Sequence, residues 1–231
     1  MKNVVNKVMW IISFVPLVIT AVVLGFLPDK VPMHYNSEGE IDRWGSKYEN
    51  LIFPIIIIFL ALFWQMFIWY FEKKAAKSKE DKIRKEAVSN AKVLSIVSIS
   101  MSVMYCIMQC FFLYKAYIEA NTKVTGDVID TAQMSCILLG LMFVVIGNFM
   151  PKTRRNGVVG LRIVWSMHND VTWTKSNRFA GIALIIVGVL TIITSIFVEG
   201  MLATGLMLIY LFISLIVMVI YSYKVYKTQV N

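Results

Sequence analysis

Ionisable side chains are missing from the interior of the six long apolar runs in this chain. Charged residues and histidine inside a membrane span are the usual marks of proton relays, ion paths and coupling sites. Their absence argues against a pump or an ion-coupled transporter and leaves a small-solute transporter as a minor alternative. The strongest polar residues in the runs are four amides, which interhelical hydrogen bonds would explain: Gln65, Gln109, Gln133 and Asn148.

Cysteine and histidine are scarce, with three and two residues respectively. Cys106, Cys110 and Cys136 fall inside apolar runs, so we expect buried thiols that act as small hydrophobic residues, and no disulfide framework. The chain has no H-E-x-x-H zinc motif, no Walker loop and no Gly-x-Ser-x-Gly elbow. We therefore expect no cofactor and no catalytic residue.

Apolar residues are abundant. They make up 58% of the 231 residues, more than a soluble domain of this size needs for its core. A bilayer core about 30 Å thick requires roughly 20 apolar residues per helix. We predict an all-α, polytopic transmembrane helical bundle with six spans, at residues 8–27, 51–71, 93–114, 131–150, 180–198 and 202–223.

The basic residues alternate between the two sides of these spans. One side, which includes both termini, carries 18 Lys and Arg residues, and the other carries 5. Cytoplasmic loops are enriched in Lys and Arg, so both termini are predicted to be cytoplasmic. The net charge of +9 is then explained by topology and by attraction to anionic membrane lipid, with no direct nucleic-acid partner.

This topology predicts three segments. Residues 1–72 form an N-terminal two-span unit with an ordered extracytoplasmic loop at 28–50, residues 73–92 form a cytoplasmic basic connector, and residues 93–231 form a four-span unit. We expect residues 72–92 to form a short charged helix, supported by the i,i+4 pairs Glu80–Arg84 and Asp81–Lys85.

The extracytoplasmic loop mixes prolines, turn residues, aromatics and carboxylates, a composition typical of an ordered turn on the membrane face. We expect it to be a folded plug or a docking surface, and a metal site at His34, Glu38 and Asp42 remains a minor alternative. The candidate residues in this loop are Pro28, Pro32, His34, Asn36, Gly39, Asp42, Trp44 and Gly45.

The cytoplasmic segment 147–181 interleaves Arg and Trp. Asn169 and Asp170 are typical of a helix cap at the entry to the fifth span. Two interpretations are open: an interfacial helix anchored by positive charge, or a specific pocket for an anionic headgroup or a partner. The candidate residues are Asn148, Pro151, Lys152, Arg154, Arg155, Asn156, Gly160, Arg162, Trp165, Trp173 and Arg178.

This segment closely resembles the signature of the Sdp-type immunity proteins, which are related to the immunity factor for a sporulation-delaying toxin. The matching residues are Gly147, Asn148, Met150, Pro151, Lys152, Asn156, Gly160, Arg162, Trp165, Trp173, Arg178 and Gly181. The chain departs from the family pattern where prolines are usual, at Arg155 and at Ile163–Val164. The outer loop resembles a short membrane domain of unknown function that often precedes this signature.

The resemblance implies an integral protein of the bacterial cell membrane that gives resistance to a secreted membrane-active peptide toxin. Some members of the family also hold a transcriptional repressor at the membrane. The resemblance then implies that signal transduction is part of this protein's function. The alternative is a membrane enzyme or lipid-headgroup-binding protein. In that case Asp170 or His168 would act as the base. A lipid phosphate would be held by four arginines, namely Arg154, Arg155, Arg162 and Arg178.

Overall fold

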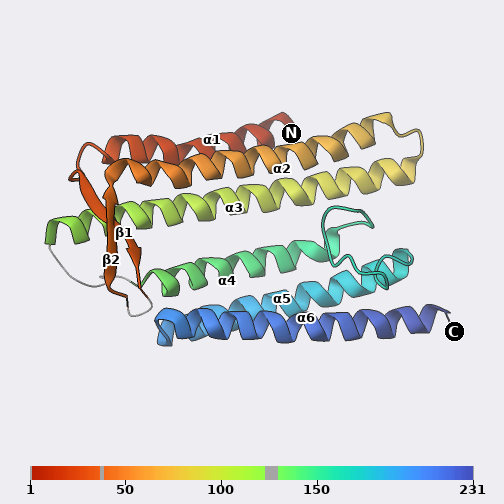
Figure 1. Ribbon diagram of the computed structural model, residues 1–231. Coiled ribbons are helices and arrows are strands. Elements are labelled where there is room, and N and C mark those ends of the chain that lie inside the picture. Colours follow the sequence, from red (N-terminus) through yellow and green to blue (C-terminus); the bar gives the residue numbers. More distant parts are fainter. Residues whose placement is uncertain (1, 37–38, 123–129, 231) are drawn as a thin grey trace.

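The computed structural model describes residues 2–36, 39–122 and 130–230 and shows six long helices beside one small sheet (Figure 1). The elements are α1 (Lys2–Val23), β1 (Lys30–Tyr35), β2 (Ile41–Ser46), η1 (Lys47–Leu51), α2 (Ile52–Lys77), α3 (Asp81–Thr122), α4 (Thr131–Phe149), η2 (Met150–Lys152), α5 (Asp170–Phe197) and α6 (Gly200–Val230).

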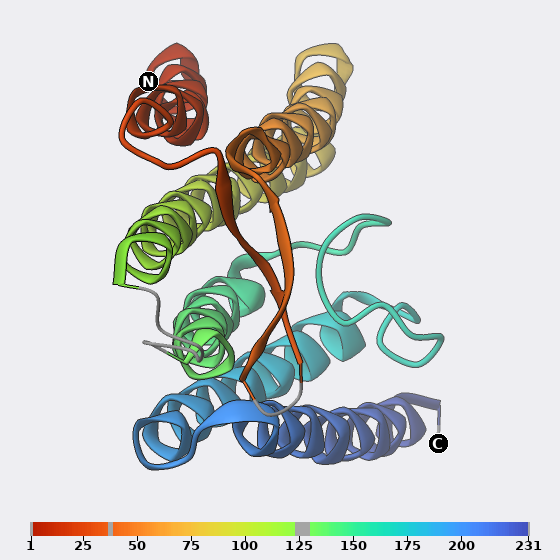
Figure 2. The ribbon, with the colours of Figure 1, turned by 60° about the vertical axis from the view of Figure 1, so that its left-hand side comes forward.

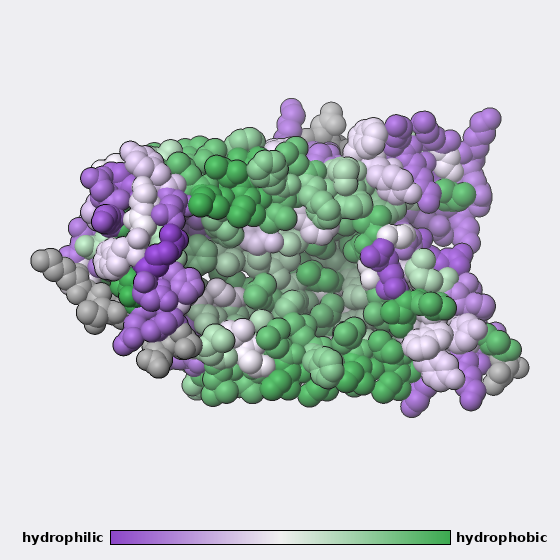
Figure 3. Space-filling view, in the orientation of Figure 1, coloured by the Kyte–Doolittle hydropathy of each residue, from purple (hydrophilic) through white to green (hydrophobic). Residues whose placement is uncertain are grey.

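All six helices are long and apolar enough to cross a membrane, as predicted. Their outward side chains are apolar, and Ile11, Phe59 and Phe212 are each 65% exposed. Figure 3 shows a green apolar belt between two purple polar ends. A surface of this kind is solvated by lipid tails and not by water.

The helices pack as two sets of three, α1–α3 and α4–α6, which lie one above the other in Figure 1. Polar bonds between helices support each set. Gln109 of α3 donates to Thr20 of α1 (2.8 Å), and Ser176 of α5 bonds Ser222 of α6 (3.0 Å). The prediction of an interhelical bond is confirmed for Gln109.

The same prediction is wrong for the other three amides in the part of the chain that the structure describes. Asn148 is exposed on α4, and Gln133 uses its backbone N–H to bond the helix-capping carboxylate of Asp130 (2.8 Å). Gln65 is half-buried, and no interhelical bond forms there. Hydropathy marks an amide as costly in lipid, but its rotation about the helix axis decides whether a partner is within reach.

Methionine fills the contact between the two helix sets. Met104, Leu138 and Met142 are buried between α3 and α4, with Met101 and Met108 packed against them. Methionine side chains are unbranched and adapt to irregular gaps, so this contact is more deformable than an aliphatic core.

The loop between α1 and α2 adds one small sheet to the predicted helical bundle, because its strands β1 and β2 pair in antiparallel fashion. Val31 of β1 is fully buried against Leu24 and Leu27 and against Leu113 of α3. The hairpin crosses one end of the bundle, as the turned view in Figure 2 shows. We call this end the hairpin end and the opposite one the basic end.

The charged connector also differs from prediction. No separate helix covers 72–92; instead α2 continues to Lys77 and α3 starts at Asp81. Arg84 bonds Asp81 (2.6 Å), at i,i+3, in place of the expected Glu80 pair. Helical hydrogen bonds continue past the apolar boundary because nothing in the sequence stops them.

The free thiols are only partly as expected. Cys136 is buried, Cys106 is half-buried and Cys110 is exposed on α3, so the prediction of three buried thiols is wrong for Cys110. An exposed thiol in the apolar belt faces lipid, where it still behaves as a small hydrophobic group.

Candidate functional site

The signature motif begins with Gly147 and ends with Gly181, and these two glycines let α4 and α5 touch. A Cβ atom on Gly147 would lie 2.5 Å from the carbonyl oxygen of Gly181, and Gly140 makes the same kind of approach to Gly188 two turns away. Pro151 packs on Gly181 from the start of η2. These motif residues therefore fix the distance between two helices.

Residues 153–169, which we call the signature loop, connect η2 to α5 without a helix. The expected interfacial helix is absent here. Asn156 is buried and organises the turn: its amide donates to the carbonyls of Arg154 (2.6 Å) and Val159 (3.0 Å), and its oxygen accepts from two backbone N–H groups. This bonding gives the loop a fixed shape without secondary structure.

Trp173 anchors the signature loop from α5. The ring is 1% exposed, and its indole N–H donates to the Thr153 carbonyl (3.1 Å). Gly160 passes over this ring with a φ of +118°, and the next residue, Leu161, donates its N–H to Asn177 (2.7 Å). Trp173 and Gly160 thus serve the packing of the loop.

The predicted cap at the start of α5 is confirmed. The Asn169 side chain accepts from the Thr172 N–H (2.8 Å), and the Thr172 hydroxyl closes the capping box. Asp170 is the first helical residue and bonds Lys82 of α3 (2.7 Å) and Arg155 (3.3 Å). The acidic first turn also suits the helix dipole.

Helix α3 holds the signature loop from the other side. Asn90, 2% exposed, accepts from the Arg154 N–H (2.8 Å), and Ser89 donates to the Lys152 carbonyl (2.9 Å). Sequence reasoning missed Asn90 and Asn177. Asn177 lies four residues after Trp173 and could have been suspected from that spacing, whereas Asn90 has no local signal.

The remaining motif side chains point outward or pack on α6. Arg162 is exposed and bonds the Gly157 carbonyl, and Trp165 packs edge-on against Tyr223 (5.0 Å). Arg178 is exposed on α5, and the Lys152 ammonium lies over the Phe149 ring (4.1 Å).

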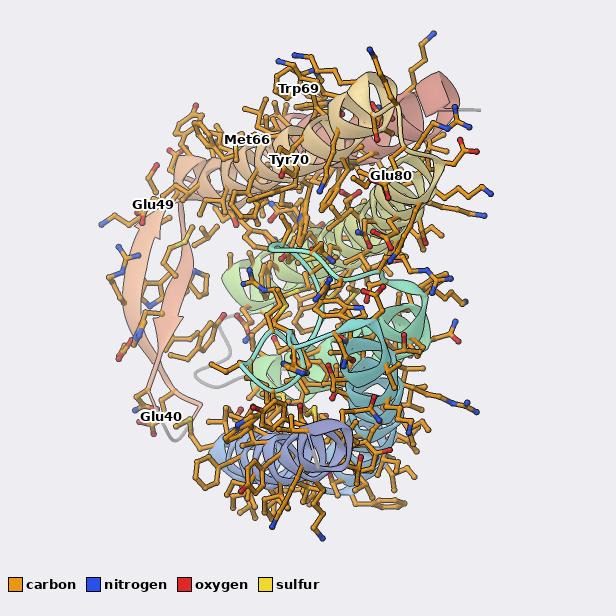
Figure 4. The ribbon with its side chains drawn as sticks, turned by 90° about the vertical axis from the view of Figure 1, so that its right-hand side faces the viewer. Glu40, Glu49, Met66, Trp69, Tyr70 and Glu80 are labelled. Atoms are coloured by element: carbon orange, nitrogen blue, oxygen red, sulfur yellow. The ribbon has the colours of Figure 1, made fainter. Side chains whose placement is uncertain are left out.

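Two cavities flank the signature loop at the basic end. One, of about 340 Å³, is lined by Lys82, Lys85, Glu86, Ser89, Arg154, Arg155, Asp170, Trp173 and Thr174. The other, of about 380 Å³, lies between α2 and residues 156–158, and Figure 4 labels three of its lining residues, Met66, Trp69 and Tyr70. Of the four arginines expected to hold a phosphate, the first cavity contains Arg154 and Arg155 but neither Arg162 nor Arg178.

The hairpin end presents the other candidate residues. Pro32 is buried, whereas Trp44 is 47% exposed. His34 bonds Asp42 (2.6 Å), and Glu38, the third candidate ligand for a metal, lies outside the described residues.

Asn36 and Gly39 shape the tip of the hairpin. Gly39 has a φ of +80°, and the Asn36 side chain accepts a hydrogen bond from the Glu40 N–H (2.9 Å). Pro28 precedes β1, and Gly45 lies against Glu49 and Met33.

A buried ionic cluster lies beneath the hairpin. Lys115 and Glu119 are 3% and 0% exposed and lie 3.9 Å apart on α3. The Tyr35 hydroxyl donates to Glu119, and Lys115 lies over the Tyr35 ring (3.5 Å) while bonding Thr131 of α4. Lys115 and Glu119 both lie beyond the predicted third span, which ends at residue 114. Their i,i+4 spacing was the signal that could have found them.

The two histidines lie at opposite ends of the molecule. His34 is on β1, and His168 packs against Tyr226 near the end of α6. Within the described ranges, no group of three or more His, Cys, Asp or Glu side chains could hold a metal ion.

Comparison with known proteins places both predicted motifs. Residues 11–58 match DUF1648, a domain of unknown function, and residues 152–222 match the SdpI/YfhL protein family. The chain is 22% identical to the immunity protein SdpI of Bacillus subtilis (strain 168) over 228 residues, 98% of this chain and 96% of that protein. No solved structure matches.

The resemblance first suggested by the signature is therefore confirmed along the chain. The two matches lie in the expected order, and each includes one of the two ordered segments described above, the hairpin and the signature loop. With its six apolar helices, the chain is a multi-pass membrane protein of the SdpI type, with a DUF1648 segment in its N-terminal part.

Proposed function

We propose that this protein is an immunity protein of the bacterial cell membrane that protects against a secreted, membrane-active peptide toxin. The observation that carries the proposal is the nearly full-length similarity to the immunity protein SdpI. We further propose that the hairpin end faces outward, because the basic end carries most of the Lys and Arg residues.

The hairpin is the surface that we assign to the toxin. Trp44 lies on β2 with 47% of its surface exposed, next to the exposed pair His34–Asp42. An exposed aromatic ring on a fixed backbone is the kind of residue that anchors a peptide at an interface. Val31 and Tyr35 hold the backbone in place from below.

We assign the protein a binding role and not a catalytic one. Three polar side chains of the motif already bond other residues of this chain. Asn156 shapes a turn, Trp173 donates to Thr153, and Asp170 is held by Lys82 and Arg155. The exposed basic side chains of the signature loop are available to a cytoplasmic partner, for which the family resemblance suggests a transcriptional repressor.

The killing curve of a deletion strain tests this function. Cells that lack the gene, treated with culture medium from a toxin-producing strain of the same or a neighbouring lineage, should die faster than the parent, and a plasmid copy should restore survival. Unchanged killing by the medium of every candidate producer would contradict the proposal.

A variant pair tests the role of the hairpin. Complementation with Trp44→Ala should restore survival only partly at equal membrane abundance. Phe197→Ala is the matched control, because Phe197 is an exposed aromatic residue (81%) at the end of α5, outside the hairpin. Full protection by the Trp44 variant would remove this residue from the toxin-binding surface.

A further inference from the structure

Four basic side chains converge on the 340 Å³ cavity at the basic end, from two elements that are far apart in the sequence. Lys82 and Lys85 come from the start of α3, and Arg154 and Arg155 come from the signature loop. Glu86 and Asp170 are the only carboxylates among the lining residues, so the lining has an excess of positive charge.

The two carboxylates do not use up this charge. Asp170 forms ion pairs with Lys82 (2.7 Å) and Arg155 (3.3 Å), and these pairs hold the two cations in place on one wall of the cavity. Across the part of the chain that the structure describes, Lys85 and Arg154 have no ion-pair partner. An anion that enters the cavity would therefore meet two cations with free donors beside two that are already positioned.

The backbone of the cavity is fixed in advance. The Arg154 N–H bonds Asn90, which is 2% exposed, and Ser89 bonds the Lys152 carbonyl. The Trp173 ring closes the floor and is tied to Thr153 (3.1 Å). A site whose wall and floor are held in this way loses less conformational freedom when it binds a ligand.

The position of the cavity indicates the source of the anion. On α3 it lies directly before Lys92, the last charged residue ahead of the third apolar span, and on the other side it follows the end of α4 by a few residues. Ser89 is four residues from position 93, or about 6 Å along a helix. The polar headgroup layer extends about 5–8 Å beyond the hydrocarbon on each side.

We propose that this basic cavity is a phosphate site that holds the headgroup of an anionic phospholipid. Arg154 offers two parallel N–H groups to the phosphate oxygens, and Lys85 adds a point charge. Lys82 and Arg155, kept in place by Asp170, complete the positive wall. The bound lipid would link α3 to the signature loop and thereby the two helix sets at this end.

Lipid retention by the purified full-length protein in a neutral detergent tests the site. The protein is mixed with phosphatidylglycerol, with phosphatidylcholine or with inorganic phosphate, and both the bound lipid, by native mass spectrometry, and the melting temperature are measured. We expect phosphatidylglycerol to be retained and to raise the melting temperature, with little effect of phosphatidylcholine.

The double variant Lys85→Gln/Arg154→Gln should lose about a hundredfold in phosphatidylglycerol affinity, since each of the two side chains contributes roughly a factor of ten. The matched control Lys224→Gln/Lys227→Gln removes the same charge from exposed positions on α6 at the same end and should retain the lipid. If the double variant does not fold, Lys85→Gln alone should show a smaller loss, because this exposed lysine has no internal bond.

Equal retention of phosphatidylglycerol by the double variant and the control would overturn the site. Stabilisation by inorganic phosphate without any response to phosphatidylglycerol would overturn the headgroup as the source of the anion. Neither readout depends on toxin protection, so the outcome is independent of the proposed immunity function.

Discussion

At the scale of single residues, the glycines of the motif stand at positions where a larger side chain does not fit. Gly160 has a left-handed backbone above the Trp173 ring, and a Cβ atom there would lie 2.8 Å from that ring and 2.6 Å from the Asn177 oxygen. Gly157, three residues earlier in the same loop, has nothing within 4 Å of a Cβ position.

Gly160→Ala should therefore lower the free energy of unfolding by about 1–3 kcal/mol, because the backbone strain and the clash with Trp173 add. Gly157→Ala is the matched control and should change it by less than about 0.5 kcal/mol. Thermal unfolding of both variants in detergent measures the difference. Equal melting temperatures would show that the Gly160 conformation is not required.

The amides that hold the signature loop show where reading the sequence reaches its limit. Asn169 was identified as a cap because capping is local in the chain. Asn90 bonds a backbone N–H 64 residues away, and only the packing of α3 beside the loop brings the two groups together. Hydropathy likewise does not predict whether Asn148 faces a neighbouring helix or the outside of the bundle, since it does not fix the rotation of the helix about its axis.

At the scale of the elements, α3 connects the two ends of the molecule. Its 42 residues extend about 63 Å at 1.5 Å per residue, roughly twice the thickness of a bilayer core. Near one end Lys115 and Glu119 lie under the hairpin, and near the other Ser89 and Asn90 hold the signature loop. The predicted span ends at residue 114 because charged residues follow, and hydropathy alone does not show that the hairpin buries them.

The buried pair gives a prediction for α3 and the hairpin. Lys115→Met should destabilise the protein by about 3–5 kcal/mol, because it leaves Glu119 charged and buried. The double variant Lys115→Met/Glu119→Met should lose less, since it removes the buried carboxylate together with the buried ammonium.

Asp81→Ala is the control for this cycle. It removes the exposed pair Asp81–Arg84 from the same helix and should cost no more than about 1 kcal/mol. Unfolding free energies of the parent protein, Lys115→Met, Glu119→Met and the double variant give the coupling between Lys115 and Glu119. A double variant that is less stable than the single one would contradict an ionic role for the cluster.

The contact of α4 with α5 gives a second prediction at this scale. Gly147→Leu should separate the helices and destabilise the protein by several kcal/mol, as overpacking against a backbone carbonyl does; about 1–3 kcal/mol is typical even for milder cases. Gly205→Leu on α6 is the control, since a Cβ there meets nothing within 4 Å. Similar unfolding curves for the two variants would show that α4 and α5 do not need this close approach.

At the scale of the whole molecule, two helix sets meet along the methionine-rich contact between α3 and α4 and are bridged at both ends. Lys115 on α3 bonds Thr131 on α4 at the hairpin end, and the signature loop contacts α3 at the basic end. Six spans were predictable because length and hydropathy are summed over about 20 residues. The strand pairing and the division into two sets were not, because both depend on contacts between distant segments.

The orientation of the molecule is the claim on which the assignment of the hairpin to the toxin depends. Cysteine labelling in intact cells measures it directly, with Cys106, Cys110 and Cys136 replaced by alanine and one reporter introduced at a time. A maleimide that does not cross the membrane is the label. It should react with Trp44→Cys on the hairpin in intact cells, and with Lys175→Cys near the start of α5 only after the cells are opened. Labelling of position 175 in intact cells, with position 44 protected, would contradict the outward-facing hairpin.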